Sequence, residues 1–281
     1  MEVLNSIEKV RYMVNMWKKE GLTVGFVPTM GYLHEGHKSL IEKAINENDK
    51  VVVSIFVNPI QFGPKEDLSN YPKDLKSDMK LCEAEGVDII FNPENKAMYF
   101  DDFSTYIDIN ELGEELCGKS RPIHFRGVCT VVAKLFNIIP ANKAYFGEKD
   151  AQQLAIIKRI VRDLNFDIEI IGCSIIRETD GLAKSSRNSY LSKEERKAAV
   201  ILFKSLEKAK DILNNGEKNS EVIRKVIIDN IEKEILAKID YVQVVDSLSM
   251  RVVDKIEKSI LVAIAVKIGK TRLIDNFTFE V

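Results

Sequence analysis

The chain has 281 residues, of which 45% are hydrophobic and 30% are charged, and its formal net charge is −2. A chain of this length buries a large core and is expected to form two domains. The balanced charge excludes an overall basic field for nucleic acid or for an anionic membrane. The longest apolar runs, Val51–Val57 and Ile260–Val266, are strand-sized and far shorter than the ~20 residues of a membrane span.

The first 20 residues carry charges throughout, which predicts an amphipathic helix and not a signal peptide. The four cysteines, Cys82, Cys117, Cys129 and Cys173, are far apart and form no C-x-x-C pair. This spacing disfavours a structural zinc site and a secreted disulfide framework, and it indicates scattered buried thiols in a reducing compartment. We therefore expect a cytoplasmic protein.

Up to about residue 176, strand-like apolar runs alternate with helical patterns. The apolar residues just before Pro28 predict a first strand, and a helix begins near His37. The further segments are strands at Asp49–Val57, Val87–Phe91, Ala144–Phe146 and Ile168–Ile176 and helices at Leu75–Glu85, His124–Ile139 and Ala151–Leu164. The alternation predicts an α/β fold with a doubly wound, Rossmann-like parallel sheet that helices cover on both faces.

The pattern changes after about residue 190. Two Lys- and Glu-rich segments predict helices, and three strand-like runs follow them. The helices are at Lys193–Asn214 and Ser220–Ala237, and the strands are at Tyr241–Val245, Ile260–Lys267 and Thr271–Phe279. This order predicts a smaller C-terminal α+β domain. We expect domains over residues 1–176 and 177–281, with the polar stretch Glu178–Asn188 as the hinge.

Two of the three histidines, His34 and His37, lie in one loop after the first strand. A strand, a glycine-bearing loop and a helix start form the βα turn where α/β sheets bind nucleotides. Gly36 lets a phosphate approach the backbone, and helix-start N–H groups and imidazoles favour negative charge. The alternative is a surface loop with two incidental histidines. Zinc binding is disfavoured because the H-E-x-x-H spacing is absent.

Two later segments carry cations that suit a polyphosphate. Lys184-Ser185-Ser186-Arg187-Asn188 lies at the expected hinge, where Arg187 would bind phosphate in bidentate fashion. Gly147-Glu148-Lys149-Asp150 lies between a strand and a helix, so it belongs to the same sheet edge as His37. The structural alternatives are a solvated linker for the first segment and an N-capping turn with Asp150 as the cap for the second.

Three neutral amides, Asn58, Gln61 and Gln153, would hydrogen-bond a small polar acid without adding charge, although ordinary surface amides are the alternative. The segment Arg121–Gly127 either adds positive charge over the site or serves as a helix entry. The chain contains no G-x-x-x-x-G-K-[ST], G-x-G-x-x-G or G-x-S-x-G motif. A Walker-type kinase, a standard dinucleotide site and a hydrolase nucleophile elbow are therefore disfavoured.

The pairing of H-x-G-H with a KMSKS-like basic cluster resembles the nucleotidyl-transferase superfamily. Six segments between residues 24 and 192 are together similar to the pantoate–β-alanine ligase (pantothenate synthetase) family: VPTMGYLHEGHKSLI, SIFVNPIQFG, YPKDLKSD, HFRGVCTVVAKLFNII, YFGEKDAQQLAIIKRIVRDL and GLAKSSRNSYLS. The resemblance implies that ATP and pantoate give pantoyl-adenylate and pyrophosphate, and that β-alanine then displaces AMP to form pantothenate. The C-terminal third resembles the family mainly in its helix-then-strand layout, as a lid domain.

The resemblance also implies the site residues. The ATP-binding set is Met30, Gly31, Tyr32, Leu33, His34, Glu35, Gly36, His37, Gly147, Glu148, Lys149, Asp150, Ile176, Lys184, Ser185, Ser186 and Arg187. The expected catalytic residues are His37, as proton donor, with His34, Lys149 and Arg187. The substrate-binding residues are Gln61, at a position shared by pantoate and β-alanine, with Gln153 and Asn58. Mg²⁺ is expected with ATP, held by phosphates more than by a protein cage, so no protein metal site is expected.

The family further suggests a homodimer whose partners are small molecules, with no nucleic acid and no membrane. Three positions depart from its pattern: Lys184 replaces a commoner apolar residue, Ile123 a commoner glycine and Phe100 a usual proline. One rival function is another adenylyl- or cytidylyl-transferase, which the neutral amides disfavour because a phosphorylated acceptor needs cations. The other rival is a non-catalytic nucleotide- or RNA-binding module, against which the retained catalytic residues and the absence of a basic stripe argue.

Overall fold

The computed structural model describes residues 1–64 and 66–281. The chain divides into two compact units, each with its own sheet and hydrophobic core. The first unit comprises Met1–Gly113, Arg121–Glu148 and Gln153–Ser174. The second comprises Glu114–Ser120, Lys149–Gln152 and Ile175–Val281.

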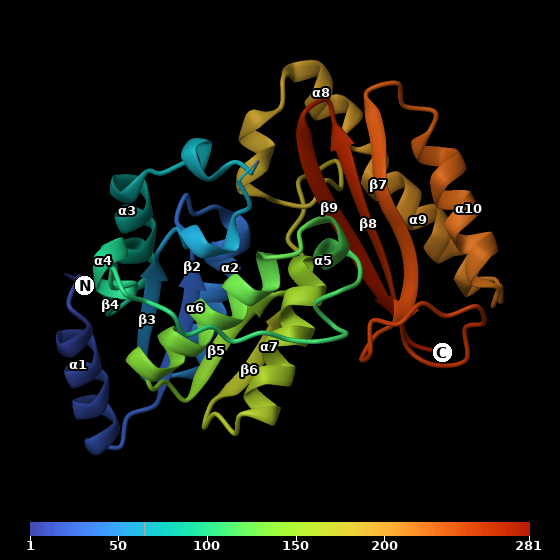
Figure 1. Ribbon diagram of the computed structural model, residues 1–281. Helices are drawn as coiled ribbons and strands as arrows, with labels where there is room; N and C mark the ends of the chain where they lie inside the picture. The colour runs from blue at the N-terminus through green and yellow to red at the C-terminus, as the bar shows by residue number, and fades with distance from the viewer. Residues whose placement is uncertain (65) are drawn as a thin grey trace. The chain divides into compact units, whose positions relative to one another are not determined.

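The first unit is an α/β layer structure in which strands and helices alternate (Figure 1). Its strands are β1 (Glu2–Leu4), β2 (Val24–Thr29), β3 (Lys50–Ile55), β4 (Ile89–Phe91), β5 (Lys143–Gly147) and β6 (Glu169–Cys173). Its helices are α1 (Ile7–Lys19), α2 (Glu35–Glu47), α3 (Leu75–Glu85), α4 (Asn95–Met98) and α6 (His124–Ile138), with 3₁₀ turns η1 (Pro59–Gln61) and η2 (Leu68–Asn70). The turn η3 (Glu148–Asp150) and helix α7 (Ala151–Asp163) start at the end of β5.

The six strands are all parallel, in the order β1-β4-β3-β2-β5-β6. From β2 the sheet grows outward through β3 and β4, and it then continues on the other side of β2 with β5 and β6. The switch point of the topology, where such sheets bind ligands, therefore lies between β2 and β5. The predicted Rossmann-like parallel sheet is confirmed.

The residues of β2 alternate between the two faces of this sheet. Val27 is buried in a cluster with Leu40 and Ile41 of α2. Its neighbour Phe26 packs edge-on against Phe136 of α6, with ring centroids 6.5 Å apart. Because successive strand residues point to opposite faces, α2 and α6 cover opposite faces of the sheet. This burial on both faces is why the strand is a nearly continuous apolar run in the sequence.

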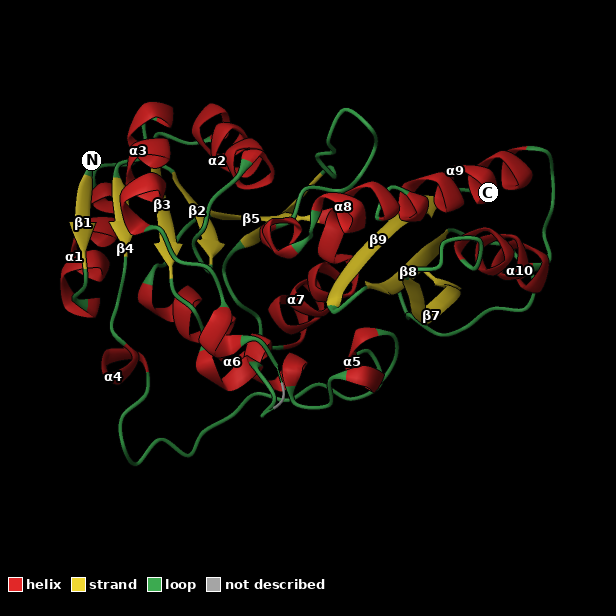
Figure 2. Ribbon diagram, turned by 90° about the horizontal axis from the view of Figure 1, so that it is seen from above, coloured by secondary structure: helices red, strands yellow, loops and turns green. Residues whose placement is uncertain are grey.

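The second unit is the expected α+β arrangement. It contains α5 (Cys117–Ser120), the 3₁₀ turn η4 (Ser186–Tyr190), α8 (Lys193–Ala198), α9 (Ile201–Asn214), α10 (Ser220–Ile231), β7 (Ala237–Asp246), β8 (Ile260–Ile268) and β9 (Thr271–Phe279). The strands form an antiparallel sheet in the order β7-β8-β9, and α9 and α10 lie along it (Figure 2). Its core joins side chains of both helices to the sheet, among them Leu206, Ile227 and Ile264.

Three helix predictions are wrong in their extent, beyond shifts of a few residues at element ends. Residues 1–20 are not one helix, because Glu2–Leu4 pairs with β4 as an edge strand and Ser6 then caps α1. The predicted helix Lys193–Asn214 is two helices, α8 and α9. The predicted helix Ser220–Ala237 ends at Ile231, and Ala237 already belongs to β7.

Candidate active site

The loop between β2 and α2 follows the carboxyl end of a central strand. Helix α2 begins at Glu35, two residues earlier than predicted, and His34 is its N-cap. The backbone N–H of Gly36 donates to Nδ1 of His34 at 3.1 Å, and the N–H of His34 donates to Nδ1 of His37 at 3.3 Å. The imidazoles therefore act as a capping pair with ring centroids 4.2 Å apart, and they satisfy N–H groups that a helix start leaves open.

These two hydrogen bonds determine which ring nitrogen carries the proton. A neutral imidazole has one donor and one acceptor nitrogen. Because Nδ1 accepts in both His34 and His37, each neutral ring carries its proton on Nε2. The start of α2 thus has two Nε2–H donors, at the helix end whose dipole favours anions.

Asp78 of α3 holds the same loop from the neighbouring helix. Its Oδ2 accepts from the N–H of Tyr32 at 3.0 Å, and its Oδ1 accepts from the N–H of Leu33 at 2.7 Å. The residue is 2% exposed, and burial raises the pKa of its carboxyl, which the two N–H donors oppose. Gly31 and Tyr32 have φ of 82° and 54°, so the carboxylate fixes a left-handed turn.

A second polar group follows β3, the strand beside β2. The side chain of Asn58 donates from Nδ2 to Oε1 of Gln61 at 3.0 Å, and Nε2 of Gln61 lies 3.1 Å from Sδ of Met30. The hydroxyl of Tyr99 donates to Oδ1 of Asn58 at 2.7 Å. The structure therefore brings Asn58 and Gln61 together, nearly fully buried, and connects them to the first loop through Met30.

The start of α6 supports the turn that carries Gln61. Nδ1 of His124 lies 3.1 Å from the carbonyl oxygen of Gln61, and Nε2 lies 3.1 Å from a guanidinium nitrogen of Arg121. Because a guanidinium only donates, Nε2 accepts and Nδ1–H donates to the carbonyl. Arg121 is also paired with Glu66, and Arg126 stacks over a tyrosine ring. These contacts favour the helix-entry interpretation of this segment.

The third predicted ATP-binding segment begins at the end of β5. Gly147 is the last residue of this strand, which pairs with β2, and Glu148 is the first residue of η3. This 3₁₀ turn leads directly into α7, so Asp150 lies inside a helical stretch and not in an extended capping position. Gln153 lies in the first turn of α7 and is half-buried.

In the second unit, the hairpin formed by residues 176–184 brings Ile176 and Lys184 together. The N–H of Lys184 donates to the carbonyl of Ile176 at 2.9 Å, and its Nζ lies 2.9 Å from Oε2 of Glu178. Next, the hydroxyl of Ser185 accepts from the N–H of Arg187 at 3.3 Å and caps η4, which begins at Ser186. Lys184 is thus an ion-pair partner within the hairpin.

The other two departures from the family pattern lie at the surface. Ile123 is 43% exposed at the start of α6, and Phe100 is 69% exposed. Neither position therefore fills space in the core. The four cysteines are all buried and form no disulfide, as predicted.

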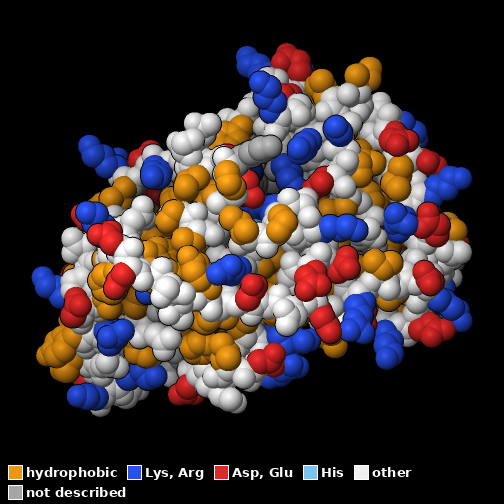
Figure 3. Space-filling model, in the orientation of Figure 1, with side chains coloured by type: hydrophobic (Ala, Val, Ile, Leu, Met, Phe, Trp, Pro, Cys, Tyr) orange, Lys and Arg blue, Asp and Glu red, His pale blue; other side chains and the backbone are white. Residues whose placement is uncertain are grey.

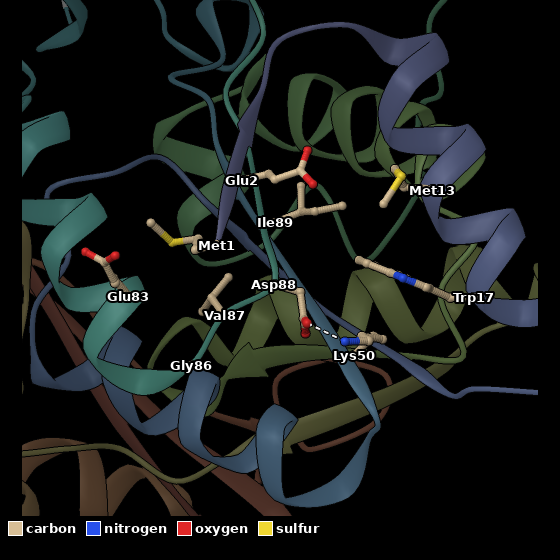
Figure 4. Close-up of a pocket in the computed structure, with 10 residues that line it drawn as sticks. All are labelled: Met1, Glu2, Met13, Trp17, Lys50, Glu83, Gly86, Val87, Asp88 and Ile89. Atoms are coloured by element: carbon tan, nitrogen blue, oxygen red, sulfur yellow. Dashed lines mark hydrogen bonds and ion pairs between the residues drawn. The ribbon is translucent and has the colours of Figure 1, made fainter.

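A pocket of about 390 Å³ lies elsewhere on the first unit (Figure 4). Its lining includes Trp17 and the ion pair between Lys50 and Asp88, with Nζ and Oδ1 2.8 Å apart. Lys50 opens β3 and Ile89 opens β4, so the pocket lies at the amino ends of the strands. The predicted residues of this unit follow the carboxyl ends, and none of them lines the pocket.

Two supporting residues, Asp78 and Tyr99, were missed by sequence reasoning, and the roles of His124 and Gly127 beneath Gln61 were not foreseen within the predicted segment Arg121–Gly127. Each acts through a partner far away in the sequence, as Asp78 does through the loop at Tyr32. The one local signal is a carboxylate on the buried side of the predicted helix Leu75–Glu85, where an unpaired charge is costly.

Comparisons with known proteins cover the whole chain. The family described as Pantoate-beta-alanine ligase matches residues 2–278. Proteins named Pantothenate synthetase from Clostridium acetobutylicum and Enterococcus faecalis are 66% and 67% identical over 281 and 280 residues, which is 100% of this chain and 100% and 99% of those proteins.

Solved structures agree with these relatives. Pantothenate synthetase from Thermus thermophilus has a TM-score of 0.92 and 39% identity, with 99% of each chain covered. Pantoate-beta-alanine ligase from Francisella tularensis, complexed with β-γ ATP and β-alanine, has a TM-score of 0.79 and 39% identity, covering 99% of this chain and 97% of that one. The chain therefore belongs to the pantoate–β-alanine ligase family.

Proposed function

We propose that the protein is an ATP-dependent ligase that condenses pantoate with β-alanine to form pantothenate. The observation that carries the proposal is the pair of Nε2–H donors of His34 and His37 at the carboxyl end of β2, connected through Met30 to the buried amides of Asn58 and Gln61. A phosphate-binding helix start and a neutral acid-binding group thus belong to one sheet edge. Membership of the family over the full chain supports the same activity.

The chemistry explains why ATP is consumed. A carboxylate does not react with an amine, because the leaving group would be oxide. In the first step a carboxylate oxygen of pantoate attacks the α-phosphorus of ATP, the bond to pyrophosphate breaks, and pantoyl-adenylate forms. In the second step the amine of β-alanine attacks the acyl carbon, AMP leaves with the bonding electron pair, and the nitrogen loses a proton. The main barrier of the first step is charge on the phosphates.

We assign the ATP-binding role to Met30–His37, Gly147–Asp150, Ile176 and Lys184–Arg187. The Nε2–H groups of His34 and His37 donate to phosphate oxygens, and His37 acts as the proton donor. Lys149 and Arg187 supply positive charge to the developing pyrophosphate. The catalytic set is therefore His37, His34, Lys149 and Arg187, as the resemblance implies.

The orientation of the Gln61 amide supports its role toward pantoate and β-alanine. Burial raises the pKa of Tyr99, so its hydroxyl stays protonated and donates to Oδ1 of Asn58. Asn58 must then donate from Nδ2 to Oε1 of Gln61, which leaves Nε2 of Gln61 as the donor that faces Sδ of Met30. A thioether is a weak acceptor, so a substrate oxygen is a better partner for this N–H. Gln153 is proposed as a second pantoate contact.

Mg²⁺ is proposed to enter with ATP. Within residues 1–64 and 66–281, no three His, Cys, Asp or Glu side chains converge to hold a metal ion. The described residues therefore do not fit a protein cage for the ion, and its ligands would be mainly phosphate oxygens and water. Bound there, it would neutralise charge on the triphosphate.

The partners are proposed to be small molecules and a second copy of the chain, with a cytoplasmic location. The face in Figure 3 carries Lys and Arg side chains interspersed with Asp and Glu, so it has no field of a single sign. None of the helices in the described part of the chain combines the length and the apolar character that a membrane crossing requires. The division at residue 176, with the C-terminal part as a lid that moves at Glu178–Asn188, remains a prediction.

The test of the activity is pyrophosphate release from Mg-ATP and pantoate, with and without β-alanine. We expect release with pantoate alone, whereas AMP and pantothenate appear once the amine is added. ATP binding without release under any combination would favour a transferase with another acceptor. Absence of ATP binding as well would favour the non-catalytic module.

An Asp78→Asn variant is expected to increase the KM for ATP by about tenfold or more, the loss of one hydrogen bond to a charged group. An asparagine has one acceptor oxygen, and its NH₂ group would face the N–H of Tyr32 or Leu33. Asp74→Asn is the matched control, because Asp74 caps the same helix through Ser77. Equal KM values for ATP in the two variants would show that Asp78 does not hold the loop for nucleotide.

A further inference from the structure

Strand β9 carries two adjacent buried polar residues, Asp275 and Asn276, which are 2% and 6% exposed. Successive side chains of a strand point to opposite faces, so Asp275 and Asn276 contact different parts of the second unit. Polar side chains are seldom so deeply buried unless they are hydrogen-bonded, and both are. Their partners lie in the second unit: Lys149 for Asn276, and for Asp275 the residue Arg177 of the hairpin that leads into Lys184–Arg187.

Asn276 holds the first of these segments. Its Nδ2 donates to the backbone carbonyl of Lys149 at 2.8 Å. This bond holds the main chain at Lys149, the residue that carries the proposed phosphate cation. The Nζ of Lys149 lies 3.9 Å from Oδ1 of Asp150, so its own contacts within this turn are loose.

Asp275 holds the second segment through Arg177. The guanidinium donates to both carboxylate oxygens of Asp275, at 2.7 and 3.0 Å, and NH1 also donates to the carbonyl of Gly181 at 3.0 Å. The group lies 5.0 Å above the ring of Phe203. Arg177 thereby spans the hairpin from its base to its tip, and this hairpin leads into Lys184 and Ser185.

Gly181 shows how closely the hairpin is seated. Its φ is 94°, and a methyl group at this position would overlap the ring of Phe203. The hairpin therefore packs tightly against Phe203 of α9, and Arg177 connects it to β9.

We propose that Asp275 and Asn276 are positioning residues for ATP. Through their partners, the single strand β9 holds Lys149 and the segment Lys184–Arg187 at the spacing that binding of the triphosphate requires. The inference rests on the proposed function. It predicts that loss of the Asn276–Lys149 bond or of the Asp275–Arg177 pair weakens ATP binding in the adenylation step. The β-alanine step should be unchanged. A displacement of about 1 Å between such groups is enough to cost about a hundredfold in rate.

Asn276→Ala tests the first link, with Asn230→Ala as the matched control. Asn230 lies in the same unit, is 5% exposed and donates from Nδ2 to Ser205 at 2.8 Å, so both variants lose one buried amide. We expect Asn276→Ala to raise the KM for ATP by about tenfold, the scale of one lost hydrogen bond, with the KM for β-alanine unchanged. A merely structural role would lower the active fraction, and hence kcat, in both variants with every KM unchanged.

Arg177→Lys tests the second link and decides the matter if Asn276→Ala does not fold. Lysine keeps the charge opposite Asp275 but loses the two-pronged fork and the bond to Gly181. The KM for ATP should increase here too. Wild-type KM for ATP in the folded variants would overturn the proposal. If the wild-type chain releases no pyrophosphate, the proposed function fails, and the Kd of ATP measured by calorimetry on the same variants still decides the inference.

Discussion

Replacing His37 with alanine is expected to lower the rate of pantoate-dependent pyrophosphate release by about 10²–10³, the usual cost of removing one transition-state donor. The imidazole of His37 accepts at Nδ1 from the N–H of His34, so its proton lies on Nε2. The capping bond at Nδ1 orients the Nε2–H group of His37 before substrate binds. For this reason, we expect loss of this donor to cost more than loss of an average hydrogen bond. Rapid-quench measurement of the first turnover isolates this step from product release.

The alanine variant also removes a helix cap, and caps contribute about 1 kcal/mol to stability. His37→Asn separates the two effects. An asparagine oxygen can accept from the N–H of His34 in place of Nδ1, but asparagine has no N–H donor at the position of Nε2. We expect His37→Asn to keep the Tm of the wild type and still to lose the rate. Adenylation at the wild-type rate in either variant would refute the role of His37 as donor.

Much of the fold follows from local patterns in the sequence. The central strands are buried on both faces and read as apolar runs, and the helices carry one apolar face each. The errors lie at the edges. Glu2–Leu4 is too short and too exposed to show a strand pattern, and it becomes a strand only because β4 offers an open edge. Ala237 begins β7 through pairing with Ile268, which no local pattern reveals.

The candidate site was predicted to the extent that its groups belong to single segments. His34 and His37 belong together because both lie at one helix start, and Asn58 and Gln61 because they share one turn. Their supports come from distant parts of the chain. Asp78 contacts a loop 45 residues away in the sequence at Leu33, and Asn276 contacts Lys149 across 127 residues. Such pairings depend on the tertiary fold, so one sequence does not show which residues pair, even where it shows that Asp78 lies on a buried helix face.

Gly127→Ala is expected to raise the KM for pantoate by about a hundredfold, which is the scale of a 1 Å misplacement. A methyl group at Gly127 would lie 2.5 Å from the carbonyl oxygen of Ile60 and 2.6 Å from the nitrogen of Gln61. Both are backbone atoms and cannot rotate away, so η1 and α6 must separate. The carbonyl of Gly127, which accepts from Asn58 at 3.1 Å, moves with the helix.

Two effects on stability oppose each other in this variant. Alanine favours a helix over glycine by about 1 kcal/mol, whereas overpacking costs about 1–3 kcal/mol, so the clash dominates and the Tm should fall. Val132→Ala is the matched control, because Val132 is buried in the same helix, five residues after Gly127, and its truncation destabilises without a clash. We expect the control Val132→Ala to have a KM for pantoate near the wild-type value. The KM for ATP should stay near its wild-type value in both variants. A normal KM for pantoate in folded Gly127→Ala would show that α6 does not position Gln61 for substrate.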